Sequence, residues 1–208
     1  MKKGRIAVLL SGRGSNFRAL YKATKEGKIP AEIVLVITDK KNAPGAASAR
    51  EYGIETLYFR RKDYPDRVLF DMAIADAIEK RNIDLICLAG YMRILSPEFI
   101  KRFRGRIMNI HPALLPCFPG LHAQKQALDY GVRFSGATVH FVDEGVDSGP
   151  IILQSVVPVY QDDTDETLAE RILKEEHRIY PEAVKLFFEG RLEIKGKKVI
   201  IKNEGDSS

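Results

Sequence analysis

Cysteine and long apolar runs are both scarce in this sequence. The chain contains two cysteines, Cys87 in an apolar stretch and Cys117 in a predicted loop. Their spacing fits neither a disulfide framework nor a zinc site, so we expect a reducing compartment and no metal. The first apolar run, residues 6–10, is too short for the core of a signal peptide, and no later run approaches membrane length. We therefore expect a cytoplasmic protein that does not contact a membrane.

A continuous patch of one charge is also missing. The 33 Lys and Arg are interleaved with 28 Asp and Glu, which leaves a net charge of +5. Nucleic acid is therefore not indicated as a partner, whereas a small anionic substrate is compatible with this charge. With 208 residues, of which 45% are hydrophobic, the chain fits one compact domain. The sequence does not distinguish a monomer from a homodimer.

The N-terminal apolar run leads into a glycine-rich turn. Residues 6–10 are typical of a central parallel strand, and residues 11–16 (SGRGSN) precede a predicted helix. Such a turn favours an anion because free N–H groups and the helix dipole converge there, and its last two residues are suited to cap the helix or bind the ligand. This turn has three possible roles: a phosphate loop, a structural turn, or a dinucleotide site in which the Asp39 carboxylate binds the ribose. Phe17 disfavours the dinucleotide site, because that fingerprint needs a small residue at its position.

The following segments alternate between strands and helices. Strands are expected at residues 33–37, 55–59 and 84–90, and helices at residues 43–52 and 64–80. The last of these helices is expected to turn four residues inward, namely Val68, Met72, Ala75 and Ile78. Ser96 followed by Pro97 marks the start of a further helix. The loop before it either lines a pocket outside the strand ends or packs as part of the core.

A central stretch, residues 107–120, contains two polar residues in an apolar run. Asn109 and His111 lie two apart on the predicted strand, so they project from the same face. They are either satisfied polar groups of the core or a donor pair directed at a reacting carbonyl. Asp147 lies in a glycine-rich turn 36 residues after His111, from which a carboxylate can reach back to the imidazole.

The C-terminal part has a different pattern. We expect a helix at residues 124–130, a hairpin-like strand pair at residues 134–142 and 150–157, and a long helix at residues 165–189. His140 shares a face with Thr138 and is interpreted as a satisfied core histidine or a supporting polar residue of the site. The long helix has five candidate inward residues, namely Leu168, Ile172, Ile179, Val184 and Phe187. Residues 195–208 are expected to form a basic hairpin strand and a frayed tail.

Four ordered motifs carry a resemblance. They are residues 11–16, residues 89–95 (AGYMRIL), residues 109–112 (NIHP) with 118–122 (FPGLH), and residues 139–154 (VHFVDEGVDSGPIILQ). Together they resemble the phosphoribosylglycinamide formyltransferases of purine synthesis. The resemblance implies a Rossmann-like α/β fold with a mostly parallel central sheet, helices on both faces and an antiparallel C-terminal part. It also implies one domain, with a phosphate-binding half at 1–100 and a catalytic, folate-binding half at 101–194.

The resemblance also assigns residues to roles, with 10-formyltetrahydrofolate as co-substrate and glycinamide ribonucleotide as acceptor. The catalytic set is Asn109, His111 and Asp147. The ribotide contacts are Gly14, Ser15, Asn16, Leu173, Lys174, Glu175 and Glu176. The folate contacts are Arg67, Met92, Arg93, Ile94, Leu95, Asn109, Asp143, Glu144, Gly145, Val146 and Asp147. Arg13 and Cys117 stand at loop positions that vary among relatives.

Formyl transfer builds negative charge on the formyl oxygen. Asn109 and a protonated His111 are suitable donors to that oxygen, and Asp147 is expected to raise the pKa of His111, orient it and shuttle the proton. A competing assignment makes His111 the general base and Asp147 only its orienting partner. The sequence contains no Ser nucleophile elbow, and Cys117 is not in a setting that would activate its thiol. Direct transfer without a covalent enzyme intermediate is therefore expected.

Other functions are less compatible with the sequence. A 10-formyltetrahydrofolate hydrolase can use the same three residues, but such relatives usually carry an extra N-terminal domain. Formyl transfer to a charged tRNA needs an additional C-terminal domain and a basic face. A non-catalytic nucleotide-binding protein leaves Asn109, His111 and Asp147 without a role.

Overall fold

The computed structural model describes residues 3–205. The chain divides into two compact units, one ending at Met108 and the other beginning at Asn109. The division falls inside strand β5 (Ile107–His111). No helix within the described residues is both long and apolar enough to cross a membrane.

The first unit is built on parallel strands in the order β3-β2-β1-β4. The strands are β1 (Gly4–Leu10), β2 (Ala31–Thr38), β3 (Glu55–Tyr58) and β4 (Leu85–Leu88). The helices are α1 (Ser15–Lys25), α2 (Pro44–Glu51), the short 3₁₀ helix η1 (Arg61–Asp63), α3 (Arg67–Glu79) and α4 (Pro97–Arg102). The predicted strands of this half are confirmed within a few residues at each end.

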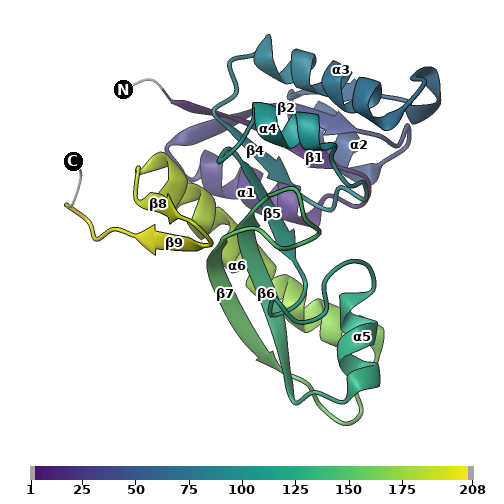
Figure 1. Ribbon diagram of the computed structural model, residues 1–208, viewed down its shortest axis with the longest axis vertical. Helices are drawn as coiled ribbons and strands as arrows, with labels where there is room; N and C mark the ends of the chain where they lie inside the picture. The colour runs from purple at the N-terminus through teal and green to yellow at the C-terminus, as the bar shows by residue number, and fades with distance from the viewer. Residues whose placement is uncertain (1–2, 206–208) are drawn as a thin grey trace. The chain divides into compact units, whose positions relative to one another are not determined.

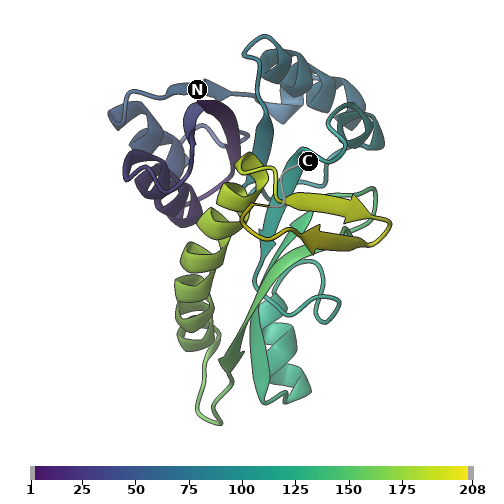
Figure 2. The same ribbon diagram turned by 90° about the vertical axis from the view of Figure 1, so that its left-hand side faces the viewer.

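Burial follows from the apolar runs of the central strands. Residues 6–10 of β1 and all of β4 are buried, as expected when helices cover both faces of a parallel sheet. In Figure 2, α1 and α2 lie on one side of these strands, and α3 and α4 lie on the other. Loops follow the carboxyl ends of β1, β2 and β4, and α/β sheets bind ligands at such loops.

Helix α3 differs from its prediction in both its start and its inward face. It begins at Arg67 rather than residue 64, because Pro65 disfavours a helical Tyr64 and the Asp66 carboxylate caps the helix by accepting from the Leu69 N–H. Ala75 and Ile78 are buried as predicted, but Val68 and Met72 are only half-buried. Phe70 and Ile74 are buried instead, so the predicted face was wrong by part of a turn.

The second unit combines strands of both directions in the order β5-β6-β7-β9-β8. Its further elements are α5 (Ala123–Tyr130), β6 (Phe134–Phe141), β7 (Ile151–Pro158), α6 (Asp165–Phe188), β8 (Leu192–Lys195) and β9 (Lys198–Ile201). Strands β6 and β7 pair antiparallel, as predicted, and α6 packs along both of them (Figure 1). The mixed fold, mostly parallel at first and antiparallel near the C-terminus, is thus confirmed.

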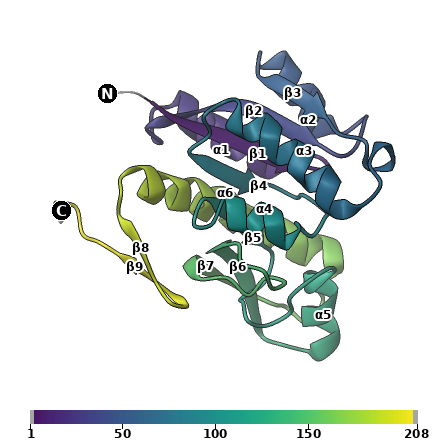
Figure 3. The same cartoon turned by 45° about the horizontal axis from the view of Figure 1, so that its top comes forward.

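Two details of the C-terminal part differ from the predictions. Phe187 is half-buried, and Leu186 takes the inward position near the end of α6. The hairpin of β8 and β9 begins at Leu192 rather than at residue 195 (Figure 3). The last three residues of the expected frayed tail, 206–208, lie outside the described part of the chain.

Candidate active site

The glycine-rich turn after β1 has the geometry of an anion-binding loop. Gly14 adopts φ +72° as the N-cap residue of α1, and no side chain caps this helix. Of the two roles predicted for Ser15 and Asn16, capping the helix is therefore wrong, because both residues lie within its first turn, and binding the ligand stays a prediction. Several of the first N–H groups of a helix have no partner inside the helix, so this turn is suited to a phosphate.

Gly45 holds this turn in place and was not identified from the sequence. Its N–H donates to the Gly12 carbonyl at 3.0 Å. A Cβ added to Gly14 would lie 2.6 Å from the Gly45 Cα, so the two backbones approach too closely for any side chain. The only signal for this contact in the sequence was the run of small residues at 43–47.

Asp39 is engaged by the protein rather than left for a ribose. Its carboxylate accepts from the Ser11 hydroxyl at 2.6 Å and lies 3.6 Å from the Arg93 guanidinium. Its side chain is only 3% exposed. These contacts favour the phosphate loop over the dinucleotide site.

The loop between β4 and α4 alternates between buried and exposed side chains. Tyr91 and Leu95 are buried, whereas Met92 and Ile94 are 63% and 59% exposed. The core interpretation therefore holds for Leu95 but not for Met92 and Ile94, and the pocket interpretation stays a prediction. Two exposed apolar side chains in a loop outside the strand ends offer an apolar ligand a surface to contact. Arg67, at the first position of α3, is exposed.

In the second unit, β5 places Asn109 and His111 beside the loop that follows β6. The imidazole of His111 is buried and has oxygen atoms at both nitrogens. Its Nε2 donates to the Phe118 carbonyl at 2.8 Å, and its Nδ1 lies 3.3 Å from the Asp147 carboxylate. Asn109 Nδ2 lies 3.5 Å from the other carboxylate oxygen. The structure thus brings the three predicted catalytic residues together.

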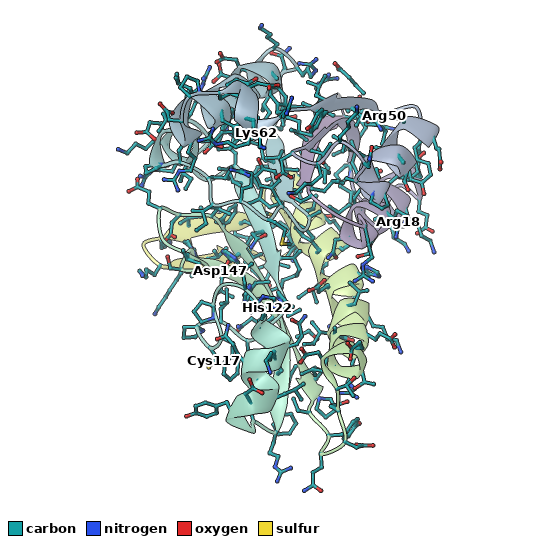
Figure 4. All side chains as sticks on the ribbon, turned by 90° about the vertical axis from the view of Figure 1, so that its right-hand side faces the viewer. Arg18, Arg50, Lys62, Cys117, His122 and Asp147 are labelled. Carbon is teal, nitrogen blue, oxygen red and sulfur yellow. The ribbon has the colours of Figure 1, made fainter. Side chains whose placement is uncertain are left out.

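Asp147 is positioned by an unusual backbone. It has φ +49°, a conformation that a residue other than glycine rarely adopts and that is often found at functional sites. Its carboxylate also accepts from the Gly120 N–H at 2.8 Å. The turn closes at Gly149, where a Cβ would lie 1.8 Å from the Phe141 carbonyl oxygen. Figure 4 shows Asp147 together with His122 and Cys117, which belong to the loop before α5.

The pKa of His111 corrects one expectation. Burial lowers the pKa of His111, and His140 lowers it further, although Asp147 and the Phe118 carbonyl act in the opposite direction. The predicted net rise of this pKa is therefore wrong. Burial also raises the pKa of Asp147, but contacts with His140, the Gly120 N–H and His111 outweigh burial and hold this pKa below its ordinary value. A neutral imidazole beside a charged carboxylate is favoured near neutral pH.

His140 belongs to this group of residues, which we call the β5 cluster: Asn109, His111, His140 and Asp147. Its Nδ1 donates to the Phe141 carbonyl at 2.9 Å, and its Nε2 lies 3.3 Å from Asn109 Nδ2. Its Nε2 also lies 3.7 Å from the Asp147 carboxylate. The role of a supporting polar residue, rather than an isolated core histidine, fits these contacts.

The remaining residues of the 143–147 turn are mostly exposed. Asp143 Oδ1 accepts from the Gly145 N–H at 3.1 Å and from the Ser148 hydroxyl at 2.7 Å, which organises the turn locally. Glu144, Gly145 and Val146 are exposed. Their backbone is therefore accessible next to Asp147.

The α6 residues assigned to the ribotide have different environments. Leu173 is half-buried, Lys174 is exposed, and Glu176 is buried although it is acidic. Glu175 accepts from the Ser155 hydroxyl at 2.5 Å and from Arg178, and these hydrogen bonds lower its pKa. The Glu175 carboxylate is therefore held by other side chains of the protein. Glu176 differs from it because an acidic side chain is seldom buried.

No group of His, Cys, Asp and Glu side chains able to hold a metal ion occurs within residues 3–205. Neither cysteine forms a disulfide; Cys87 is buried in β4 and Cys117 is exposed. A family model described as formyl transferase matches residues 4–184. The chain belongs to the formyl transferase family.

Relatives within this family are similar over most of the chain. A phosphoribosylglycinamide formyltransferase of Haemophilus influenzae is 45% identical over 195 residues, which cover 94% of this chain and 91% of that one. A trifunctional purine biosynthetic protein adenosine-3 of Drosophila melanogaster is 47% identical over 91% of this chain. The matched part spans only 14% of that protein's own length.

Several solved structures have the same fold as this chain. The glycinamide ribonucleotide transformylase 1 of Symbiobacterium toebii has a TM-score of 0.95 and 51% identity, covering 97% of this chain and 95% of that one. A formyltetrahydrofolate deformylase of Pseudomonas syringae has a TM-score of 0.90 but only 24% identity, and this chain covers 67% of it. The second likeness therefore concerns the fold alone.

Proposed function

We propose that this formyl transferase moves the formyl group of 10-formyltetrahydrofolate to the amine of glycinamide ribonucleotide, a step of purine synthesis. The β5 cluster is the observation that carries this proposal, because amide, imidazole and carboxylate groups meet there within hydrogen-bond distance. The similar proteins named for this activity support the same choice of substrates.

Stabilisation of the formyl oxygen is assigned to Asn109 and His111. Asn109 Nδ2 has two hydrogens, so donation to the substrate does not require it to lose every protein contact. His111 Nε2 donates to the Phe118 carbonyl, and a formyl oxygen that replaces this carbonyl would leave the N–H satisfied. Two donors directed at developing negative charge are the usual means of lowering the barrier to acyl transfer.

The proton of the attacking amine is assigned to Asp147 and His111. Both groups have lowered pKa values, so the carboxylate is charged and the imidazole is neutral near neutral pH. The His111 Nδ1 lone pair faces Asp147, and this 3.3 Å contact becomes a hydrogen bond once either partner takes up a proton. The amine nitrogen loses this proton, the C–N bond to the folate breaks, and the departing folate nitrogen gains the proton. No covalent enzyme intermediate is needed.

The two substrates are assigned to different sets of residues. The ribotide phosphate is assigned to the loop at Gly14, Ser15 and Asn16, with residues 173–176 contacting the same substrate. The folate is assigned to Arg67, residues 92–95 and residues 143–147, together with Asn109. Exposure of Met92 and Ile94 supports the folate assignment, since a pterin ring is flat and partly apolar. We retain one functional domain, with a phosphate-binding half at 1–100 and a catalytic half at 101–194. Small-molecule partners and a cytoplasmic location remain predictions.

A spectrophotometric assay tests this function directly. Purified protein is mixed with 10-formyl-5,8-dideazafolate, with and without glycinamide ribonucleotide, and release of the deformylated product is followed. Release that depends on the ribotide is the expected result. Equal release without the ribotide would identify water as the acceptor and favour the hydrolase.

A further inference from the structure

The loop at residues 91–95 has no regular secondary structure, yet hydrogen bonds hold it near both ends. The Met92 N–H donates to the Ser11 hydroxyl oxygen at 3.0 Å. Just beyond the other end, the Ser96 N–H donates to the Asp71 carboxylate at 2.6 Å. Because Asp71 and Ser96 are buried, the second contact is shielded from water.

Ser11 connects this loop with the glycine-rich turn. Its hydroxyl donates its one hydrogen to Asp39 at 2.6 Å, which leaves a lone pair for the Met92 N–H. Its own N–H donates to the Gly90 carbonyl at 3.0 Å. Ser11 is also the residue directly before Gly12, so one side chain and one peptide group link both loops.

Asp39 fixes this arrangement from the side of β2. Its side chain is almost fully buried, and its charge is balanced by Arg93, a member of the same 91–95 loop. The Arg93 guanidinium in turn lies over the Phe70 ring, 5.2 Å from the centroid. Asp39 thus contacts the loop twice, through the Ser11 hydroxyl and through Arg93.

We propose that Ser11 and Asp39 are positioning residues that couple the two binding loops of the first unit. Order imposed on the glycine-rich turn by a bound phosphate passes through Ser11 to Met92 and Arg93, where the folate ring binds. Each substrate then strengthens the binding of the other, as thermodynamic linkage requires. The inference rests on the proposed function, which assigns the phosphate and the folate to these loops.

Dead-end binding measurements test this coupling without turnover. The Kd of 5,8-dideazafolate, which carries no formyl group, is measured by calorimetry with and without saturating glycinamide ribonucleotide. In the wild type, we expect the ribotide to lower this Kd about fivefold or more. In Ser11→Ala, the ratio of the two Kd values should fall close to one. The control Asp76→Asn, which removes the negative charge of an ion pair with Arg102, should keep the wild-type ratio.

Variants of Asp39 separate positioning from general stability. Asp39→Asn keeps an oxygen acceptor for Ser11 but removes the charge beside Arg93, whereas Asp39→Ala removes both. We expect the KM for the formyl folate to rise about tenfold in Asp39→Ala and less in Asp39→Asn, with kcat within about twofold of the wild type. These two variants carry the test if Ser11→Ala does not fold.

Two results overturn the coupling. The first is a wild-type Kd that is unchanged by the ribotide, and the second is a Ser11→Ala protein that keeps the full ratio. Either result leaves the proposed function standing as long as the wild-type assay shows ribotide-dependent release of product. Loss of that release in the wild type would instead overturn the function.

Discussion

The two compact units contribute candidate site residues of different kinds. In the first unit, the residues assigned to substrates offer backbone N–H groups at Gly14 and exposed apolar side chains at Met92 and Ile94. In the second unit, Asn109, His111 and Asp147 are polar side chains that contact one another. Groups of the first kind bind without changing charge, whereas groups of the second kind can move a proton.

The proposed function therefore gives the first unit only substrate binding, and gives the second unit the chemistry together with further substrate contacts. The loops of the first unit are held by glycine packing and by carboxylates that bind other side chains of the protein, such as Asp39. Changes there are expected to appear in KM. Changes in the β5 cluster are expected to appear in kcat. The contacts of these side chains with the substrates are expected to be strongest in the transition state, when negative charge develops on the formyl oxygen.

The largest effect is expected for Asp147→Asn. The amide cannot take up the amine proton, so kcat should fall about 10³-fold, within the range of general acid–base catalysis. Binding of the ribotide, measured by calorimetry, should stay within about twofold, because its phosphate is assigned to the loop at Gly14 and the substitution leaves that loop unchanged. The control Asp129→Asn removes an exposed carboxylate that pairs with Lys125. Turnover like the wild type in Asp147→Asn would remove Asp147 from the mechanism.

Asn109→Ala should have the next largest effect. Loss of one donor to the formyl oxygen is expected to lower kcat about 10²- to 10³-fold in the steady-state assay. The substitution also removes the Nδ2 contact with His140 at 3.3 Å. Thermal unfolding therefore needs to be measured alongside, to show that the protein is folded at the assay temperature. A kcat within about threefold of the wild type would exclude Asn109 as an oxyanion donor.

Gly45→Ala tests whether a change in the first unit affects substrate binding rather than chemistry. A Cβ at this position would lie 2.8 Å from the Gly14 Cα, so the glycine-rich turn must shift. We expect the ribotide KM to rise about tenfold while kcat changes little. Ala47→Ser, on an exposed position of the same helix, is the matched control. A large fall in kcat at unchanged ribotide KM would contradict the separation of binding from chemistry.

The pH dependence should show the smallest change, and it distinguishes the two proton assignments. The folded-state pKa of His111 lies below 6.5, so the neutral imidazole is the form present at higher pH. Activity should therefore fall as pH drops below 6.5 and stay nearly constant between about pH 7 and pH 8.5. Activity that instead falls as pH rises through 6.5 would show that the cationic imidazole is the working form.

Local patterns predicted much of the fold. The apolar runs of β1 and β5 and the Ser96-Pro97 helix start are local signals, and the structure confirms these elements. The inward face of α3 was wrong because neighbouring apolar residues on a helix give several similar faces, and only the packed sheet selects among them.

The site was less predictable from the sequence. The pairing of Ser11 with Asp39 and the packing of Gly14 on Gly45 join residues about 30 apart in the chain. The direction of the His111 pKa depends on burial, which a sequence pattern does not provide. His140 carries no local sign of its contact with Asn109, because that contact crosses between β5 and β6.

The central claim is that the formyl carbon goes to the ribotide rather than to water. The most direct test uses 10-formyl-5,8-dideazafolate with a ¹³C-labelled formyl carbon and follows that carbon by NMR in the presence of glycinamide ribonucleotide. The account predicts that the label appears in the formamide of the ribotide. Appearance of the label as free formate would contradict the account and identify the protein as a hydrolase.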